Sequence, residues 1–155
     1  MRLTLATAFA TLIAAPALAQ IQPQDGLWSG EVAFIGQTGC PQMLEAQLRG
    51  RNDGYSNETL TFDKPFTPAA LNRLDAAFTW TQLGPDRWQG SFNEQQPTPA
   101  GPLDLNVTTV LDIEAEDRMS QTARVTVTVP EAVAGMLGMT GTICTVDSSV
   151  THRHQ

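Results

Sequence analysis

The chain has 155 residues, of which 41% are hydrophobic, and a formal net charge of −7 at pH 7. That length suits a single domain with a sizeable hydrophobic core. The acidic excess disfavours binding to nucleic-acid phosphates or to anionic lipid head groups, although it would attract cationic partners. Solubility is the simpler role for this charge.

The N-terminal segment, residues 1–19, has the three-part pattern of a cleavable signal peptide. Arg2 supplies the positive start, an apolar run covers residues 3–15, and the small residue Ala19 precedes the expected cleavage site. The run is shorter than the roughly 20 residues that a membrane-spanning helix needs. We therefore expect one domain over 20–155, without a membrane span and with a net charge of −8 once Arg2 is lost.

The two cysteines, Cys40 and Cys144, both lie in the part expected to be exported. The short, alanine-rich signal is typical of bacterial export, so we expect a periplasmic or extracellular protein. In an oxidising compartment two cysteines usually pair. We predict a structural Cys40–Cys144 disulfide, because the chain has no Cys-x-x-Cys motif for exchange chemistry.

Alternation of apolar and polar residues predicts short strands in the first half of this domain. The pattern appears over residues 28–34 and again over 44–48. The tripeptide Asn52-Asp53-Gly54 favours a turn, so residues 58–62 are expected to form the returning strand.

A second hairpin is predicted around the turn Gly84-Pro85-Asp86, with strands over 77–83 and 87–92. Four aromatic side chains share one parity in these strands, and we expect them on one face. They are Phe78, Trp80, Trp88 and Phe92.

The clearest alternation covers residues 103–115 and 119–129, which we expect to form a long antiparallel hairpin. A last strand is expected over 140–152.

Three stretches look irregular. Thr67 followed by Pro68 predicts a short helix to about Asp75. Residues 94–102 hold three prolines and are expected to form a surface loop. Residues 130–139 fit either one helical turn or a loop broken by glycine.

About eight strands and almost no helix predict an all-β domain with one disulfide. A single small antiparallel β-barrel fits this count, since eight strands close around side chains or one small ligand. A two-layer β-sandwich is the alternative.

A family resemblance rests on Gly26-Leu27-Trp28 and Arg153. This pattern resembles lipocalins and related calycin barrels, which carry Gly-x-Trp at the start of the first strand and a basic residue from the last strand over the tryptophan. The resemblance implies a barrel-floor pair of Trp28 and Arg153, joined by a cation–π contact. Gly-x-Trp also resembles the start of small secreted inhibitors of bacterial metalloproteases. The simpler interpretation is a tryptophan buried in the core.

Metal binding has little support. His152 and His154 would share one strand face, but two ligands are fewer than a zinc site requires. With Met136 and Met139 they could suit a copper ion. A frayed terminus and an apolar loop explain these residues more simply, and we predict no metal and no cofactor.

Acidic residues cluster at the end of the long strand. Asp112, Glu114 and Glu116 alternate with its apolar side chains, and Asp117 follows in the turn. Such carboxylates can bind calcium, but the spacing of an EF-hand is missing. A solvated strand face is the simpler interpretation.

No catalytic group is conspicuous in the sequence. It has no Gly-x-Ser-x-Gly motif, its histidines lie near the end, and both thiols are expected to be oxidised. We therefore expect a non-enzymatic, monomeric binding module for a small apolar ligand or a protein partner. The expected ligand-lining residues are Trp28, Phe34, Leu105, Val107, Val125 and Val127.

The alternative is an acidic inhibitor or envelope protein that binds a cationic partner. The apolar segment 132–139 would then be a contact loop.

Overall fold

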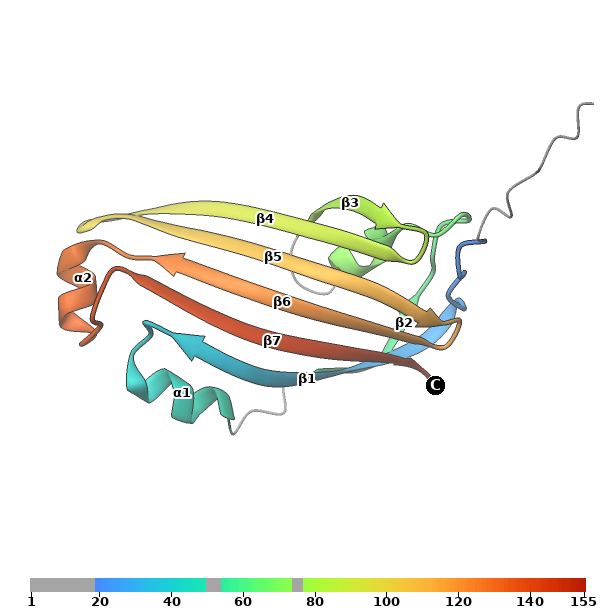
Figure 1. Cartoon of the computed structure of the whole chain (residues 1–155), viewed down its shortest axis with the longest axis horizontal. Coiled ribbons are helices and arrows are strands. Elements are labelled where there is room, and N and C mark those ends of the chain that lie inside the picture. The colour runs from blue at the N-terminus through green and yellow to red at the C-terminus, as the bar shows by residue number, and fades with distance from the viewer. Residues whose placement is uncertain (1–18, 50–53, 74–76) are drawn as a thin grey trace, which may run out of the picture.

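The computed structural model describes residues 19–49, 54–73 and 77–155, and these form one antiparallel β-sheet with short helices at its margins (Figure 1). The expected signal peptide lies outside the described residues except for Ala19, as do Asn52 and Asp53 of the predicted turn. The elements are β1 (Gly26–Thr38), α1 (Gln42–Arg49), β2 (Gly54–Leu60), η1 (Pro68–Arg73, a 3-10 helix), β3 (Thr79–Gly84), β4 (Arg87–Thr98), β5 (Gly101–Ala115), β6 (Arg118–Thr128), α2 (Glu131–Met136) and β7 (Ile143–His154).

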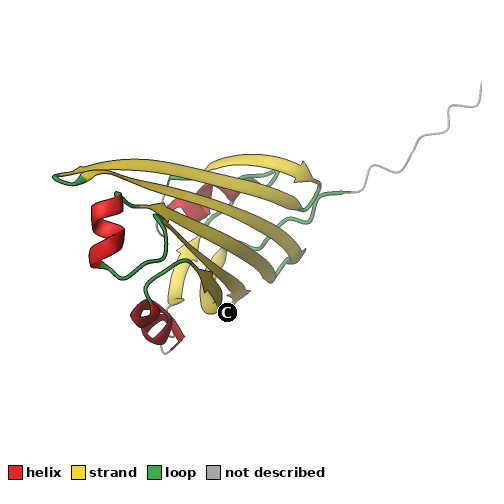
Figure 2. Ribbon diagram, turned by 60° about the vertical axis from the view of Figure 1, so that its left-hand side comes forward, coloured by secondary structure: helices red, strands yellow, loops and turns green. Residues whose placement is uncertain are grey.

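The order of the strands across the sheet is β2-β1-β7-β6-β5-β4-β3. This is the order of an up-and-down barrel that is open between β2 and β3. All six pairings are antiparallel, so β2 and β3 run in the same direction. Seven strands therefore cannot close by antiparallel pairing alone, and the sheet stays open although it curls (Figure 2).

The segment between β2 and β3 occupies one end of this opening. Phe62, Phe66 and Leu71 of the segment are buried against the sheet. Asn72 in η1 accepts a hydrogen bond from Trp80 Nε1 at 2.8 Å and so ties the segment to β3. The helix predicted after Thr67 is thus present as η1, and Asp75 lies outside the described residues.

The buried core lies at the same end of the sheet. Its side chains come from one face of β1, β5 and β6, from the last residue of β2 and from the segment after β2. They are Trp28, Leu60, Phe62, Phe66, Leu71, Leu111, Ile113 and Met119. We call the sheet face that carries Trp28, Leu111 and Met119 the inner face.

The predicted strand over 44–48 was wrong, because these residues lie in α1. Leu44 and Leu48 are half-buried one helical turn apart, and Arg49 pairs with Glu45 at 2.7 Å. The two residues of each pair are four positions apart, and residues at this spacing are neighbours on the surface of a helix. The stretch is so short that its apolar residues fit both the period of a strand and that of a helix. Because it is a helix, the described residues form seven strands instead of the expected eight or so.

The predicted loop over 94–102 was also wrong. β4 continues to Thr98, and β5 starts at Gly101. The prolines are tolerated because Pro97 and Pro102 lie opposite each other near a hairpin end. β3 does not extend beside this part of β4. Pro97 therefore does not need a backbone N–H to donate to a strand on its other side.

The other hairpins agree with their prediction. Gly84-Pro85-Asp86 joins β3 to β4, and β5 pairs with β6 along nearly its whole length. Phe78 lies with its ring centre 5.5 Å from that of Trp80 and 6.4 Å from that of Phe92. Residues 131–136 form α2, so the helical alternative was correct for the segment 130–139.

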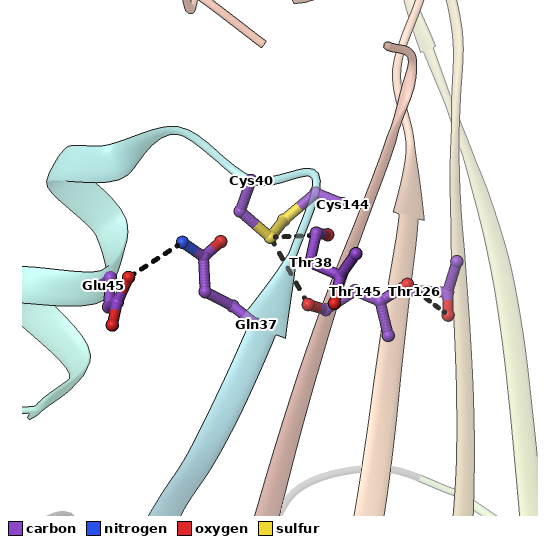
Figure 3. The surroundings of a disulfide bond; sticks show 7 residues. All are labelled: Gln37, Thr38, Cys40, Glu45, Thr126, Cys144 and Thr145. Atoms are coloured by element: carbon purple, nitrogen blue, oxygen red, sulfur yellow. Dashed lines mark hydrogen bonds between the residues drawn. A yellow bond between two sulfur atoms is a disulfide. The ribbon is translucent and has the colours of Figure 1, made fainter. Parts of the chain in front are cut away.

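The predicted Cys40–Cys144 disulfide is present at the end of the sheet opposite the core (Figure 3). It joins the loop after β1 to the start of β7. Gly39 has φ of 71°, and a Cβ there would lie 2.3 Å from the carbonyl oxygen of Ile143. Glycine therefore allows the backbones of the two segments to approach closely. None of the described helices is long and apolar enough to cross a membrane.

Replacing both cysteines (Cys40→Ser with Cys144→Ser) is expected to lower the free energy of unfolding by about 2 to 5 kcal/mol. The physical reason is the sequence separation of 104, because the bridge closes a long loop and restricts the unfolded chain. Urea unfolding followed by tryptophan fluorescence measures the change. Reduced wild-type protein serves as a control and should match the double variant, whereas equal midpoints for the oxidised protein and the variant would contradict the prediction.

Candidate ligand-binding face

Beyond the core, the inner face continues as an apolar surface toward the disulfide. We call its central side chains the inner apolar face: Val32, Phe34, Leu105, Val107, Val125 and Val127. They come from β1, β5 and β6, and Val146 of β7 lies directly opposite Val125. The five apolar positions predicted to line a ligand site besides Trp28 therefore all lie on this surface.

These side chains are only half-buried, unlike those of the core. Among the described helices, α1 makes the most contacts with the sheet, and it packs along β1. Its last residue places the Arg49 guanidinium carbon 5.7 Å from the centre of the Phe34 ring. The strands β5 and β6 carry their inner valines without comparable cover from a described element.

A row of hydrogen-bonded side chains separates the inner apolar face from the core. We call Tyr55, His152, Gln121 and Thr109 the buried polar row. The Tyr55 hydroxyl lies 2.7 Å from His152 Nδ1, and His152 Nε2 lies 3.0 Å from Gln121 Oε1. Gln121 Nε2 donates to Thr109 Oγ1 at 2.8 Å, and Thr109 Oγ1 donates to the Thr122 carbonyl at 2.8 Å. The row thus joins β2, β7, β6 and β5.

Two glycines make room for aromatic side chains at the ends of this row. A Cβ on Gly30 would lie 2.2 Å from the Tyr55 ring, and a Cβ on Gly90 would lie 2.9 Å from the Trp80 ring. Both glycines are buried on strands next to an edge strand. Tyr55 from β2 and Trp80 from β3 therefore fold inward over the neighbouring strand, which no side chain larger than hydrogen would permit.

The hydrogen-bond directions show which ring nitrogen of His152 carries the proton. Gln121 Oε1 can only accept, so His152 Nε2 carries a proton, and the Tyr55 hydroxyl then donates to Nδ1. His152 is only 2% exposed, and this burial lowers its pKa from 6.5 to about 4. Burial, and then the nearby Glu58 carboxylate, raise the pKa of Tyr55 to about 12. At neutral pH the histidine is therefore uncharged and the tyrosine remains a donor.

The predicted pairing of Arg153 with Trp28 was wrong by one residue. Arg153 lies opposite Ser29 on the outer face, whereas His154 lies opposite Trp28. The His154 ring packs edge-on against Trp28, with centroids 5.5 Å apart. Alternation along β7 requires this, because neighbouring residues face opposite sides of the sheet. Trp28 itself is fully buried, and its Nε1 donates to the carbonyl of Gln24 at 2.9 Å.

The residues considered for metal binding are not brought together. Met136 and Met139 lie near the start of β7, and His152 and His154 lie near its end. His154 also continues the strand instead of fraying. Among the described residues, no three histidine, cysteine, aspartate or glutamate side chains form a group that could hold a metal ion.

The acidic cluster is spread over the outer face and the β5–β6 turn. Asp112 pairs with Arg87 at 3.6 Å, and Glu114 pairs with Arg118 at 2.7 Å. Glu116 and Asp117 are exposed. Arginine partners and solvent therefore satisfy these carboxylates.

A shallow groove of about 570 Å³ also lies mainly on the outer face. Its rim includes Ile35 and the ion pair of Arg124 with Asp147, at 2.8 Å. The arginine hydrogen bond lowers the pKa of Asp147. Because its charges are already paired and its walls are open, this groove offers a ligand less than the inner apolar face does.

Sequence reasoning did not identify the buried polar row. The available signal was two polar residues, Thr109 and Gln121, at inward positions of otherwise apolar strands. Tyr55 had no such signal, because its role depends on the empty space at Gly30, which belongs to another strand.

Comparisons of the chain with protein-family models, with curated proteins and with solved structures found no match. A function must therefore be inferred from the side chains of the protein itself.

The substitution Gly30→Ala is expected to lower the free energy of unfolding by about 1 to 3 kcal/mol, because the new methyl group would displace the Tyr55 ring. Gly36→Ala on the same strand is the matched control, since a Cβ there would meet nothing within 4 Å. The control should change stability by no more than about 0.5 kcal/mol. Urea unfolding measures both, and equal losses would show that the space at Gly30 is not required.

Stability should fall in mild acid because of His152. The unfolded chain binds a proton there below about pH 6.5, whereas the folded protein does so only near pH 4. The contribution to the free energy of unfolding is thus fully present above pH 6.5 and is lost progressively as the pH decreases to about 4, with a total loss of about 3 kcal/mol. Urea unfolding at several pH values tests this, and a His152→Gln variant should lose this part of the dependence.

Proposed function

We propose that the protein is an exported, non-enzymatic binding module that holds a small apolar ligand on the inner apolar face. The observation that carries this proposal is the incomplete burial of aliphatic and aromatic side chains from three neighbouring parts of the sheet. Soluble monomers seldom leave a large contiguous apolar surface uncovered, and such surfaces mark binding sites. The signal-peptide pattern and the disulfide support export.

The shape of the face favours an elongated ligand. Along β7, the inner positions from Val150 to Cys144 extend for about 20 Å at the usual rise per residue. Direct cross-strand pairs such as Val107 with Val125 and Leu105 with Val127 make the surface continuous across the strands. An alkyl or polyene chain lying along the strands would bury more of this surface than a compact molecule would.

The end of the inner apolar face that borders the buried polar row would set the orientation of the ligand. The side chains of the buried polar row already satisfy one another, so they offer few free polar atoms to a ligand. An apolar end would therefore lie against the row, and any polar group of the ligand would lie toward the disulfide.

A second candidate is the binding of a protein partner of opposite charge. The segment 132–139, which the sequence marks as a possible contact loop, exposes 78% of Met136 and 50% of Leu137. Together with the acidic charge of the chain, these side chains support contact with a cationic protein.

Binding of the neutral fluorescent probe N-phenyl-1-naphthylamine tests the first proposal. Wild-type protein should bind the probe, and Val125→Asp should weaken binding at least about tenfold, because a carboxylate on the face must lose water to contact an apolar ligand. The measurement is the enhancement of probe fluorescence in a titration.

Thr126→Asp is the matched control, since its side chain lies on the opposite face of the same strand. Circular dichroism would verify that both variants fold. Absence of probe binding to the wild type, or equal affinity in the two variants, would contradict the ligand site and favour the protein-partner candidate.

A further inference from the structure

We infer that the buried polar row is a proton-sensitive latch that holds the edge strand β2 against the sheet and releases it in mild acid. This inference does not depend on the proposed ligand, because it concerns the contacts of β2 alone. Its basis is the arrangement of Tyr55, His152 and Gln121 described above.

The latch uses His152 as an acceptor on one side and a donor on the other. Thr109 orients Gln121, Gln121 orients the imidazole, and Nδ1 is left to accept from the Tyr55 hydroxyl. Protonation places a hydrogen on Nδ1, facing the hydroxyl hydrogen. The hydroxyl must then rotate and accept from Nδ1, which reverses this hydrogen bond and leaves the hydroxyl hydrogen without an acceptor in the row.

The carboxylate that acts on this row is Glu58 of β2, which helps to raise the pKa of Tyr55 and forms no ion pair with His152 among the described residues. Gly30 of β1 and Met119 of β6 lie opposite it on the two neighbouring strands. Tyr55 of β2 is the titratable group in contact with it, and it is a neutral donor at these pH values. His154 lies two residues along β7 on the same face, with its ring packed against Trp28. Among the described residues, therefore, no carboxylate is in contact with the imidazole.

β2 is the element that this change would release. It is seven residues long and pairs only with β1, in a register interrupted between Trp28 and Gly30. Only Tyr55 and Leu60 of this strand are not exposed. Leu60 lies in the core, so the other end of the strand is held mainly by the ladder with β1 and by the Tyr55 side chain. Opening there would let water reach the charged imidazole.

Amide hydrogen exchange in the folded protein tests the latch. The fraction of molecules with β2 open should rise about 30-fold between about pH 7.5 and about pH 5, since the open form has an ordinary histidine. Protection factors of the β2 amides, which correct for the intrinsic pH dependence of exchange, should fall by that factor. They should stay below those of β5 and β6 at both pH values, as local opening requires.

Three variants complete the test. His152→Gln should abolish the 30-fold change, whereas His154→Gln should retain it. The comparison shows which of the two histidines of the chain causes the pH dependence. Tyr55→Phe keeps the ring over Gly30 and removes only the hydroxyl, so it should lower β2 protection already at neutral pH. Its β5 and β6 amides should stay within about twofold of wild type.

Three outcomes would overturn the latch. The first is unchanged β2 protection in acid. The second is exchange of β2 at the same rate as β5 and β6, which would mean global unfolding instead of local release. The third is a Tyr55→Phe variant with wild-type β2 protection, an outcome that remains informative even if the His152 variant does not fold.

Discussion

The hydrogen bonds that join Tyr55, His152, Gln121 and Thr109 tie the edge strand β2 to β7, β6 and β5 across the inner face of the sheet. An odd number of strands leaves β2 and β3 parallel to each other, so antiparallel pairing cannot join them. Each edge strand instead turns one aromatic side chain inward over its neighbouring strand: Tyr55 from β2 and Trp80 from β3. Both depend on a neighbouring glycine without a side chain.

The buried polar row also divides the protein into halves with different tasks. On one side, Trp28, Phe66 and Leu111 are almost completely buried and supply most of the hydrophobic stabilisation. On the other side, the inner valines are only partly buried, and the Cys40–Cys144 disulfide and α1 lie at that end of the sheet (Figure 1). A surface that binds the proposed ligand could not also be filled by the protein, and a covalent bridge at the open end would compensate for the missing core. The proposed binding face and the inferred latch meet at this boundary.

Most strands could be predicted from the sequence because alternation is a local property. Residues 103–115 and 119–129 alternate over a length that no helix would produce, and the aromatic parity of Phe78, Trp80 and Phe92 follows from the same rule. Residues 44–48 could not be assigned, since five residues fit both a strand and a helix. The pairing of Trp28 was missed by one residue, because a shift of one along β7 exchanges Arg153 for His154 and changes the face.

The sequence by itself thus determined the all-β class, the long hairpin, the disulfide partners and the apolar residues of the inner apolar face. Each of these depends on residue type and spacing within one segment or, for the cysteines, on there being only two. Only the tertiary structure decided that the sheet stays open and that Tyr55 lies over Gly30 to contact His152. Those outcomes depend on the register between strands that are distant in the chain, and local alternation carries no information about which residue of one strand lies beside which residue of another.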